Sequence, residues 1–110
     1  MIDYNGRKFR SAVVSPNGEQ AVAQYRQDGD LLWAEFAGGE WRRGSINGVC
    51  APDGRLTFGY TMVRLDGEVI SGRCVSTPQV LADGRIRLHE EWERFGPHAD
   101  SGVSYLEEVA

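Results

Sequence analysis

The chain has 110 residues, 14 glycines and a formal net charge of −4 at pH 7. Domains commonly run to about 100 to 150 residues, so we expect one domain spanning residues 1–110. An acidic chain is repelled by phosphates, which argues against nucleic acid as a partner. The arginines spread along the sequence are expected to be solvated or paired with acidic side chains.

The sequence predicts neither a membrane span nor a secretion signal. No run approaches the roughly 20 apolar residues that cross a bilayer, and the first nine residues have no apolar core. We therefore expect a cytoplasmic protein with no membrane partner. Cys50 and Cys74 are too few for a disulfide framework, and we expect both to be small buried hydrophobes.

Six pairs of turn-forming residues divide the chain at short intervals. Each pair predicts a tight hairpin of a primed type, because such turns require the positive φ angles that glycine adopts without strain. The pairs are Asn17-Gly18, Asp28-Gly29, Gly38-Gly39, Asp53-Gly54, Asp66-Gly67 and Asp83-Gly84.

The segments around these turns have the length of strands, and their order predicts an antiparallel meander. About eight strands are expected, at residues 9–14, 20–27, 31–36, 40–50, 55–65, 68–77, 85–94 and 103–109. Helix is disfavoured, since no window of a dozen residues has an apolar stripe without a glycine or proline inside it. Eight strands with one apolar face bury it best by closing. We predict a small all-β barrel, lipocalin-like or calycin-like, with a β-sandwich as the alternative.

Alternation of apolar and polar residues predicts which side chains point into this barrel. The test favours every second residue from Leu56 to Met62, from Ile86 to Trp92 and, with a weaker contrast, from Val103 to Val109. The sidedness of the first three strands stays open.

A polar cluster is expected inside the predicted barrel. Glu90 shares the inward face with Trp92, and a buried carboxylate is costly unless it has a partner. We place Arg73 on the inward face of the preceding strand, within reach of Glu90. One interpretation is structural, with an Arg73 to Glu90 ion pair or a Tyr60 to Glu90 hydrogen bond that fixes the register. In the other, Tyr60, Arg73, Glu90 and Trp92 line a pocket and orient a ligand.

Other candidate chemistry is weaker. The pair His89 and Glu91, together with His98, lacks the spacing of known metal motifs, so we expect no metal site and no cofactor. Large aromatics in a small β-protein mostly fill the core. A tryptophan exposed on an outer face would instead mark the interface of a homodimer.

The sequence resembles a known family of small uncharacterised bacterial proteins. The similarity covers nearly the whole chain, and the residues that carry it are Tyr4 to Phe9, Gly72 to Pro78, Leu81, Asp83 to Trp92, Gly102 and Glu107-Glu108. Members are often labelled N-acetylglutamate synthase. An acetyltransferase of that kind needs an α/β domain with a phosphate-binding loop at a helix N-terminus, and the sequence predicts neither. The resemblance therefore implies one domain and no particular activity.

The sequence supports three functional hypotheses. The first is a protein that binds a small apolar or amphipathic molecule inside the barrel. The second is a cofactor-independent isomerase or cyclase with Glu90 and Tyr60 as its acid-base pair. The third is a structural or homo-oligomeric protein whose barrel interior is filled.

Overall fold

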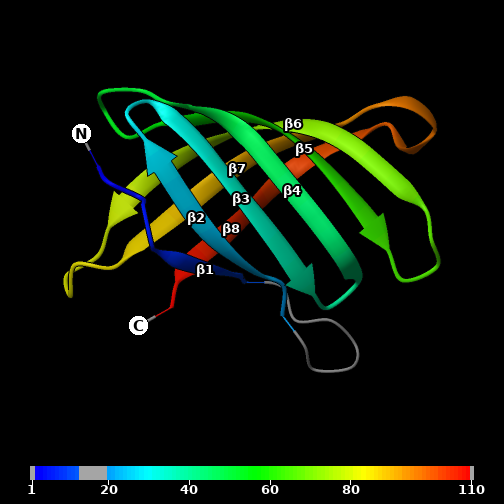
Figure 1. Ribbon diagram of the computed structural model, residues 1–110, viewed down its shortest axis with the longest axis horizontal. Helices are drawn as coiled ribbons and strands as arrows, with labels where there is room; N and C mark the ends of the chain where they lie inside the picture. The colour runs from blue at the N-terminus through cyan, green and yellow to red at the C-terminus, as the bar shows by residue number, and fades with distance from the viewer. Residues whose placement is uncertain (1, 13–19, 110) are drawn as a thin grey trace.

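The computed structural model describes residues 2–12 and 20–109. Within these residues, eight β-strands and one short 3-10 helix form a closed antiparallel barrel in chain order (Figure 1). The strands are β1 (Lys8–Ser11), β2 (Val22–Asp28), β3 (Leu31–Gly38), β4 (Trp41–Cys50), β5 (Leu56–Arg64), β6 (Val69–Val80), β7 (Ile86–Arg94) and β8 (Asp100–Glu108), and the helix η1 is Gly96–His98.

The predicted closure into a barrel is confirmed, and the sandwich alternative is wrong. Antiparallel pairing between β1 and β8 joins the two ends of the meander, so each of the eight described strands has a neighbour on both sides. Seven of the eight predicted segments match the observed strands to within three residues at both ends. The remaining one is the first, 9–14, whose residues 13–14 lie outside the described residues. The predicted Asn17-Gly18 turn also lies outside them.

The hairpin turns fall into two types, and only one matches the prediction. The β2–β3 and β3–β4 loops have two residues each, and their first residues, Gly29 and Gly39, both have φ of 61°. This places glycine where a primed turn of type II′ requires it.

The three later Asp-Gly pairs form longer turns than predicted. At Asp66-Gly67 the Arg64 N–H donates to the Glu68 carbonyl at 2.8 Å, which encloses a loop of three residues. In this loop only Gly67, with φ of 90°, has a positive φ, and the Asp66 carboxylate accepts from the Glu68 N–H at 3.0 Å. The loops at Asp53-Gly54 and Asp83-Gly84 repeat these bonds. A three-residue loop ending in such a glycine is the next hairpin class after the two-residue turns.

The length of the β5–β6 loop decides which β6 side chains face inward. The three-residue loop pairs Phe58 with Cys74 and Tyr60 with Gly72. A two-residue turn would shift the register by one and place Arg73 opposite Tyr60, which reverses the two faces of β6. The predicted inward position of Arg73 is therefore wrong, and Arg73 is exposed on the outer face.

Side-chain directions on the other strands follow the same pairing. The predicted inner faces of β5 and β7 are confirmed by the burial of Leu56, Phe58, Ile86 and Leu88. On β8 the prediction is wrong, since Val103 is 56% exposed. Register with β7 instead turns Ser104 and Leu106 inward, opposite Glu90 and Leu88. The open question on β3 is resolved, because Leu32 and Ala34 are buried.

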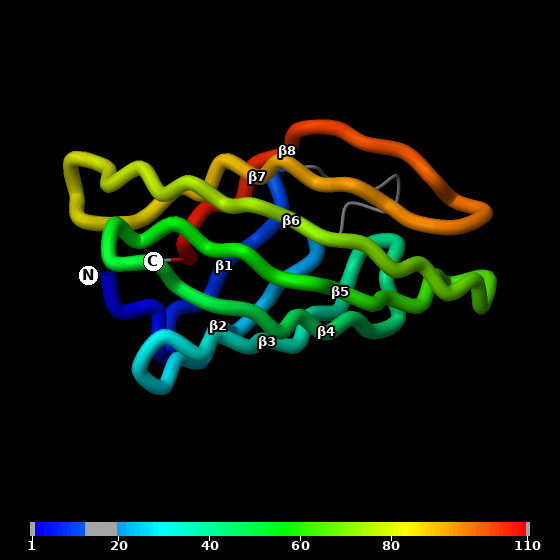
Figure 2. The backbone as a smooth tube through the Cα atoms, turned by 90° about the horizontal axis from the view of Figure 1, so that it is seen from above, coloured from blue at the N-terminus to red at the C-terminus, as the bar shows by residue number. Residues whose placement is uncertain are grey.

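An aromatic cluster closes one end of the barrel. Both chain ends lie at this end, beside the β6–β7 hairpin (Figures 1 and 2). Tyr4 is fully buried there, and its ring lies 6.2 Å from those of Phe9 and Tyr25. The Tyr4 hydroxyl donates to the Gly54 carbonyl at 2.6 Å, and burial raises its pKa above the ordinary range.

Glu108 joins three parts of the chain where the barrel closes. Its Oε1 accepts from Arg7 Nη1 at 2.8 Å and from the Ile86 N–H at 3.0 Å. Arg7 precedes β1 and Ile86 begins β7, so one carboxylate on β8 connects to both neighbouring strands. The Glu108 side chain is only 14% exposed.

We predict that Glu108→Ala lowers the free energy of unfolding by about 1 to 3 kcal/mol, since it leaves an N–H and a half-buried guanidinium without their acceptor. Glu35→Ala is the matched control, because Glu35 pairs with Arg43 in an exposed ion pair, and its loss should cost less than about 0.5 kcal/mol. Urea unfolding checks both variants. Equal losses would show that Glu108 does not close the barrel.

Candidate functional site

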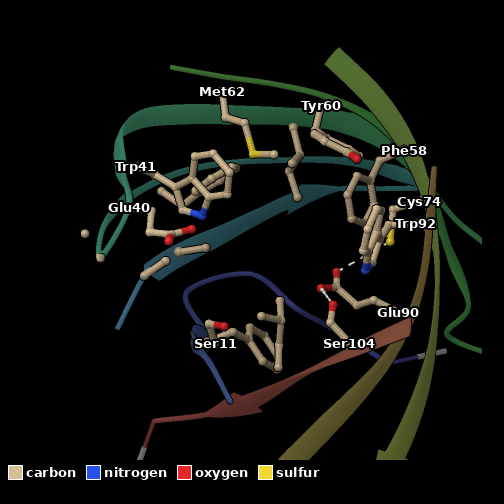
Figure 3. A pocket seen from close by; sticks show the side chains of 18 of the residues that line it. Ser11, Glu40, Trp41, Phe58, Tyr60, Met62, Cys74, Glu90, Trp92 and Ser104 are labelled. Atoms are coloured by element: carbon tan, nitrogen blue, oxygen red, sulfur yellow. Dashed lines mark hydrogen bonds between the residues drawn. The ribbon is translucent and has the colours of Figure 1, made fainter. Parts of the chain in front are cut away.

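A cavity of about 360 Å³ lies inside the barrel. It extends from Glu90 and Ser104 to the β3–β4 hairpin, where Glu40 and Trp41 lie (Figure 3). The wall is mostly aromatic and aliphatic, with Phe9, Ala23, Tyr25, Phe36, Ile46, Phe58, Tyr60, Met62, Trp92 and Leu106 among its residues. An apolar cavity with a few polar groups is the usual form of a small-molecule site.

Two glycines allow aromatic rings to lie against the cavity wall. Gly72 pairs with Tyr60, and a Cβ at Gly72 would lie 2.5 Å from the Tyr60 hydroxyl oxygen. Gly102 pairs with Trp92 in the same way, and a Cβ there would lie 2.6 Å from the indole ring. Any larger residue would push these rings into the cavity, so the glycines help to keep it open.

Glu90 is the acidic group at the inner end of the cavity. Its carboxylate accepts from Ser76 Oγ at 3.2 Å, from Ser104 Oγ at 3.4 Å and from Cys74 Sγ at 3.6 Å (Figure 3 shows Ser104 and Cys74 beside it). No ion pair to Glu90 occurs among residues 2–12 and 20–109. Burial raises the pKa of Glu90, and the three hydrogen bonds offset this only in part.

The groups around Glu90 are poor nucleophiles. Burial, and next the negative charge of Glu90, raise the pKa of the Cys74 thiol above the ordinary range. The same two causes raise the pKa of Tyr25. Cys50 and Cys74 are both free and buried, as expected, although Cys74 also bonds to Glu90.

The structure brings three of the four predicted site residues together. Tyr60, Glu90 and Trp92 line the cavity, whereas Arg73 points away from it. The predicted Arg73 to Glu90 ion pair is therefore wrong. The Tyr60 to Glu90 bond is not formed either, because the Tyr60 hydroxyl donates to the Glu93 carbonyl at 3.2 Å.

Arg94 and Trp41 are among the cavity residues that the sequence prediction missed. Arg94 is the next inward position after Trp92 on β7, so the alternation already indicated it. Trp41 is an odd number of residues from the buried Ile46 on β4, so simple alternation predicts that its side chain faces outward. A register shift between Trp41 and Arg43 turns its ring into the cavity, and such bulges commonly redirect a side chain.

Arg94 lies between two indole rings. Its guanidinium carbon is 5.0 Å from the centre of the Trp92 ring and 5.8 Å from that of Trp41. A further guanidinium, from Arg64, also lies 5.8 Å from the Trp41 ring. Arg94 Nε is buried and has no hydrogen-bond partner. Burial raises the pKa of Tyr60, and the nearby charge of Arg94 lowers it by less.

The remaining sequence candidates lie apart from the cavity. His98 contacts Glu68 at 3.4 Å, and His89 packs edge-on against Tyr105, 5.2 Å away. In the part of the chain that the structure describes, no three residues of metal-ligating type lie together. Trp33 is partly buried, with outward-facing neighbours in the sheet.

A stability measurement tests the environment of Glu90. A carboxyl whose pKa is higher in the folded than in the unfolded chain destabilises the protein as pH rises from the unfolded value of 4.5 through the folded value. We predict that Glu90→Gln removes this loss. The free energy of unfolding of the variant, relative to that of the wild type, should therefore rise by on the order of 1 kcal/mol from pH 4 to pH 7.

Glu91→Gln is the control for this comparison, because Glu91 is the exposed neighbour on the outer face of β7 and carries the same charge. Urea unfolding at both pH values gives the comparison. The same pH dependence in both variants would contradict the buried state of the Glu90 carboxyl.

One of three comparisons with known proteins found a match, and it supports the barrel fold. A family model described as avidin-like protein matches residues 2–109, nearly the whole chain. Neither a curated protein nor a solved structure matches. The family match agrees with a calycin-type barrel, and gives no support to the N-acetylglutamate synthase label. Among the described residues, no helix has the length and apolarity to span a membrane.

Proposed function

The chain belongs to the avidin-like family, and we propose that it binds a small amphipathic molecule in its barrel cavity. The observation that carries this proposal is the Glu90 carboxyl, which is buried without a cation at the inner end of an otherwise apolar cavity. A polar ligand group with hydrogen-bond donors would add to the bonds from Ser76, Ser104 and Cys74, and an apolar body would pack against the aromatic wall. Avidin itself binds biotin, which makes biotin one probe to test.

Two observations favour binding over acid-base catalysis. The Tyr60 proton is committed to the Glu93 carbonyl, and burial raises the pKa of Tyr60, so Tyr60 is a weak acid here. Tyr60 and Glu90 form no hydrogen bond with each other, so no proton passes directly between them. A filled interior is also disfavoured, because the cavity has room for a small molecule.

Native mass spectrometry of freshly purified protein tests the proposal. We expect an extra mass that denaturation removes. Ala23→Phe fills the cavity from its wall and should abolish the extra mass, whereas Val22→Phe, on the adjacent outward position, should retain it. A thermal melt confirms that both variants fold.

Defined probes cover the case in which no ligand co-purifies. Octanamide and biotin both carry N–H donors, and binding should change the fluorescence of Trp41 and Trp92, which line the cavity. A bare chain mass, together with no response to either probe at millimolar concentration, would contradict the proposal.

The expected homodimer and cytoplasmic location stay predictions. The outer face near Trp33 carries Leu31 and Val49, which are cross-strand partners and 50% exposed each. We propose this patch as the contact between two copies of the chain. Analytical ultracentrifugation of two variants tests this contact. Leu31→Glu should lower the mass measured in solution from that of a dimer to that of a single chain. Val69→Glu changes an exposed valine on β6, outside the patch, and should leave the mass unchanged.

A further inference from the structure

We propose that a groove on the outer surface of the barrel binds an acidic, extended segment of a partner protein. The groove has a volume of about 470 Å³ and runs across β1 to β4, where β2 begins and β3 ends. Lys8, Arg42 and Arg43 line it. This surface lies outside the barrel, so the proposal does not depend on which ligand the cavity binds.

The outer face of β1 to β4 is positively charged, although the chain as a whole has a net charge of −4. The described outward positions of these strands carry five exposed cations, Lys8, Arg10, Arg26, Arg42 and Arg43. The acids among these positions are Asp28 and Glu35, and Glu107 on β8 borders them opposite Arg10. Arg43 pairs with Glu35 at 2.9 Å, and the other four cations form no ion pair within the described residues. A local excess of positive charge on an acidic chain favours an anionic partner.

An irregularity in β4 places two consecutive arginines on the same side of the sheet. The register with β5 shifts between Trp41 and Arg43, which leaves Arg42 as the extra residue. Neighbouring side chains of a regular strand point to opposite faces, yet Arg42 and Arg43 both line the groove. The bulge that turns Trp41 into the cavity therefore also doubles the positive charge at one edge of the groove.

The spacing of the charges suits an extended peptide. Lys8 on β1 and Arg43 on β4 are separated by three strand spacings, roughly 14 Å at the backbone. Between them, Val22 and Ala37 are cross-strand partners that line the groove, and Val22 is 42% exposed. In an extended segment, residues four apart are separated by roughly 13 Å and point to the same side as the residue midway between them. Two acids at this spacing, with an apolar residue at the centre, match the groove.

A nucleic acid matches the groove less well than such a peptide. Glu35 lies in the groove between the cations, and the remainder of the chain is acidic. Both features repel a strand that carries a phosphate at every nucleotide, whereas two separate carboxylates can avoid Glu35.

The test uses two labelled peptides. One has three Glu-Ser-Val-Ser repeats, which place glutamate and valine alternately on one side of an extended chain, and the other has serine in place of each valine. We expect the valine peptide to bind more tightly, as measured by fluorescence polarisation at low ionic strength. Arg42→Gln combined with Arg43→Gln should weaken this binding by about threefold or more, because each exposed ion pair contributes only modestly.

Glu35→Gln provides a test with the opposite sign. It releases Arg43 and removes a repelling charge from the groove, so it should strengthen binding of the valine peptide. Arg55→Gln combined with Arg73→Gln is the matched control. Both arginines are exposed and lie outside the groove, and the double variant also loses two charges. It should leave the affinity for the peptide unchanged, and a thermal melt checks that every variant folds.

Four results would overturn the proposal. Failure of both peptides to bind at millimolar concentration or equal binding of the two would do so, as would equal weakening by the two double variants. Tighter binding of an oligothymidylate of matched length would assign the groove to nucleic acid instead. A lower mass in ultracentrifugation for the Arg42 and Arg43 double variant than for the wild type would assign it to a second copy of the chain.

Discussion

The burial of the Glu90 carboxyl without a cation is the constraint on which the interior of this barrel depends. Two hydroxyls and a thiol, from Ser76, Ser104 and Cys74, supply its hydrogen bonds. Burial raises the pKa of this carboxyl, and the three neutral donors lower it by less because they cancel no charge. A filled apolar core would be more stable with an aliphatic residue at this position, which indicates that the carboxyl serves the cavity.

The barrel could be predicted from the sequence because two simple patterns agree. Turn-forming pairs recur at intervals of strand length, and Leu56 to Met62 alternates in the manner of a half-buried strand. The part that failed was the type of turn. Asp66-Gly67 is compatible with a loop of two or three residues, and this single residue decides whether Arg73 or Cys74 faces inward.

The candidate site could be predicted only in part, for related reasons. Tyr60, Glu90 and Trp92 lie on strands with clear alternation, and Arg94 continues that pattern by one further step. Trp41 has the parity of an outward residue and reaches the cavity through a bulge, which alternation cannot reveal. The adjacent Gly38-Gly39 pair was the one local sign that the strand is irregular there. The serines that bond Glu90 depend on the register of β6 and β8 and could not be placed without it.

The protonation state of Glu90 tests this account most directly, and the carbon-13 shift of its side-chain carboxyl reports it during a pH titration. The account predicts a midpoint above the ordinary glutamate value of 4.5, and a further change in the titration when a donor-bearing ligand occupies the cavity. A midpoint at or below 4.5 would mean that the carboxyl is ionised and well compensated. That result would contradict the central claim that an unpaired acid forms the inner end of the site.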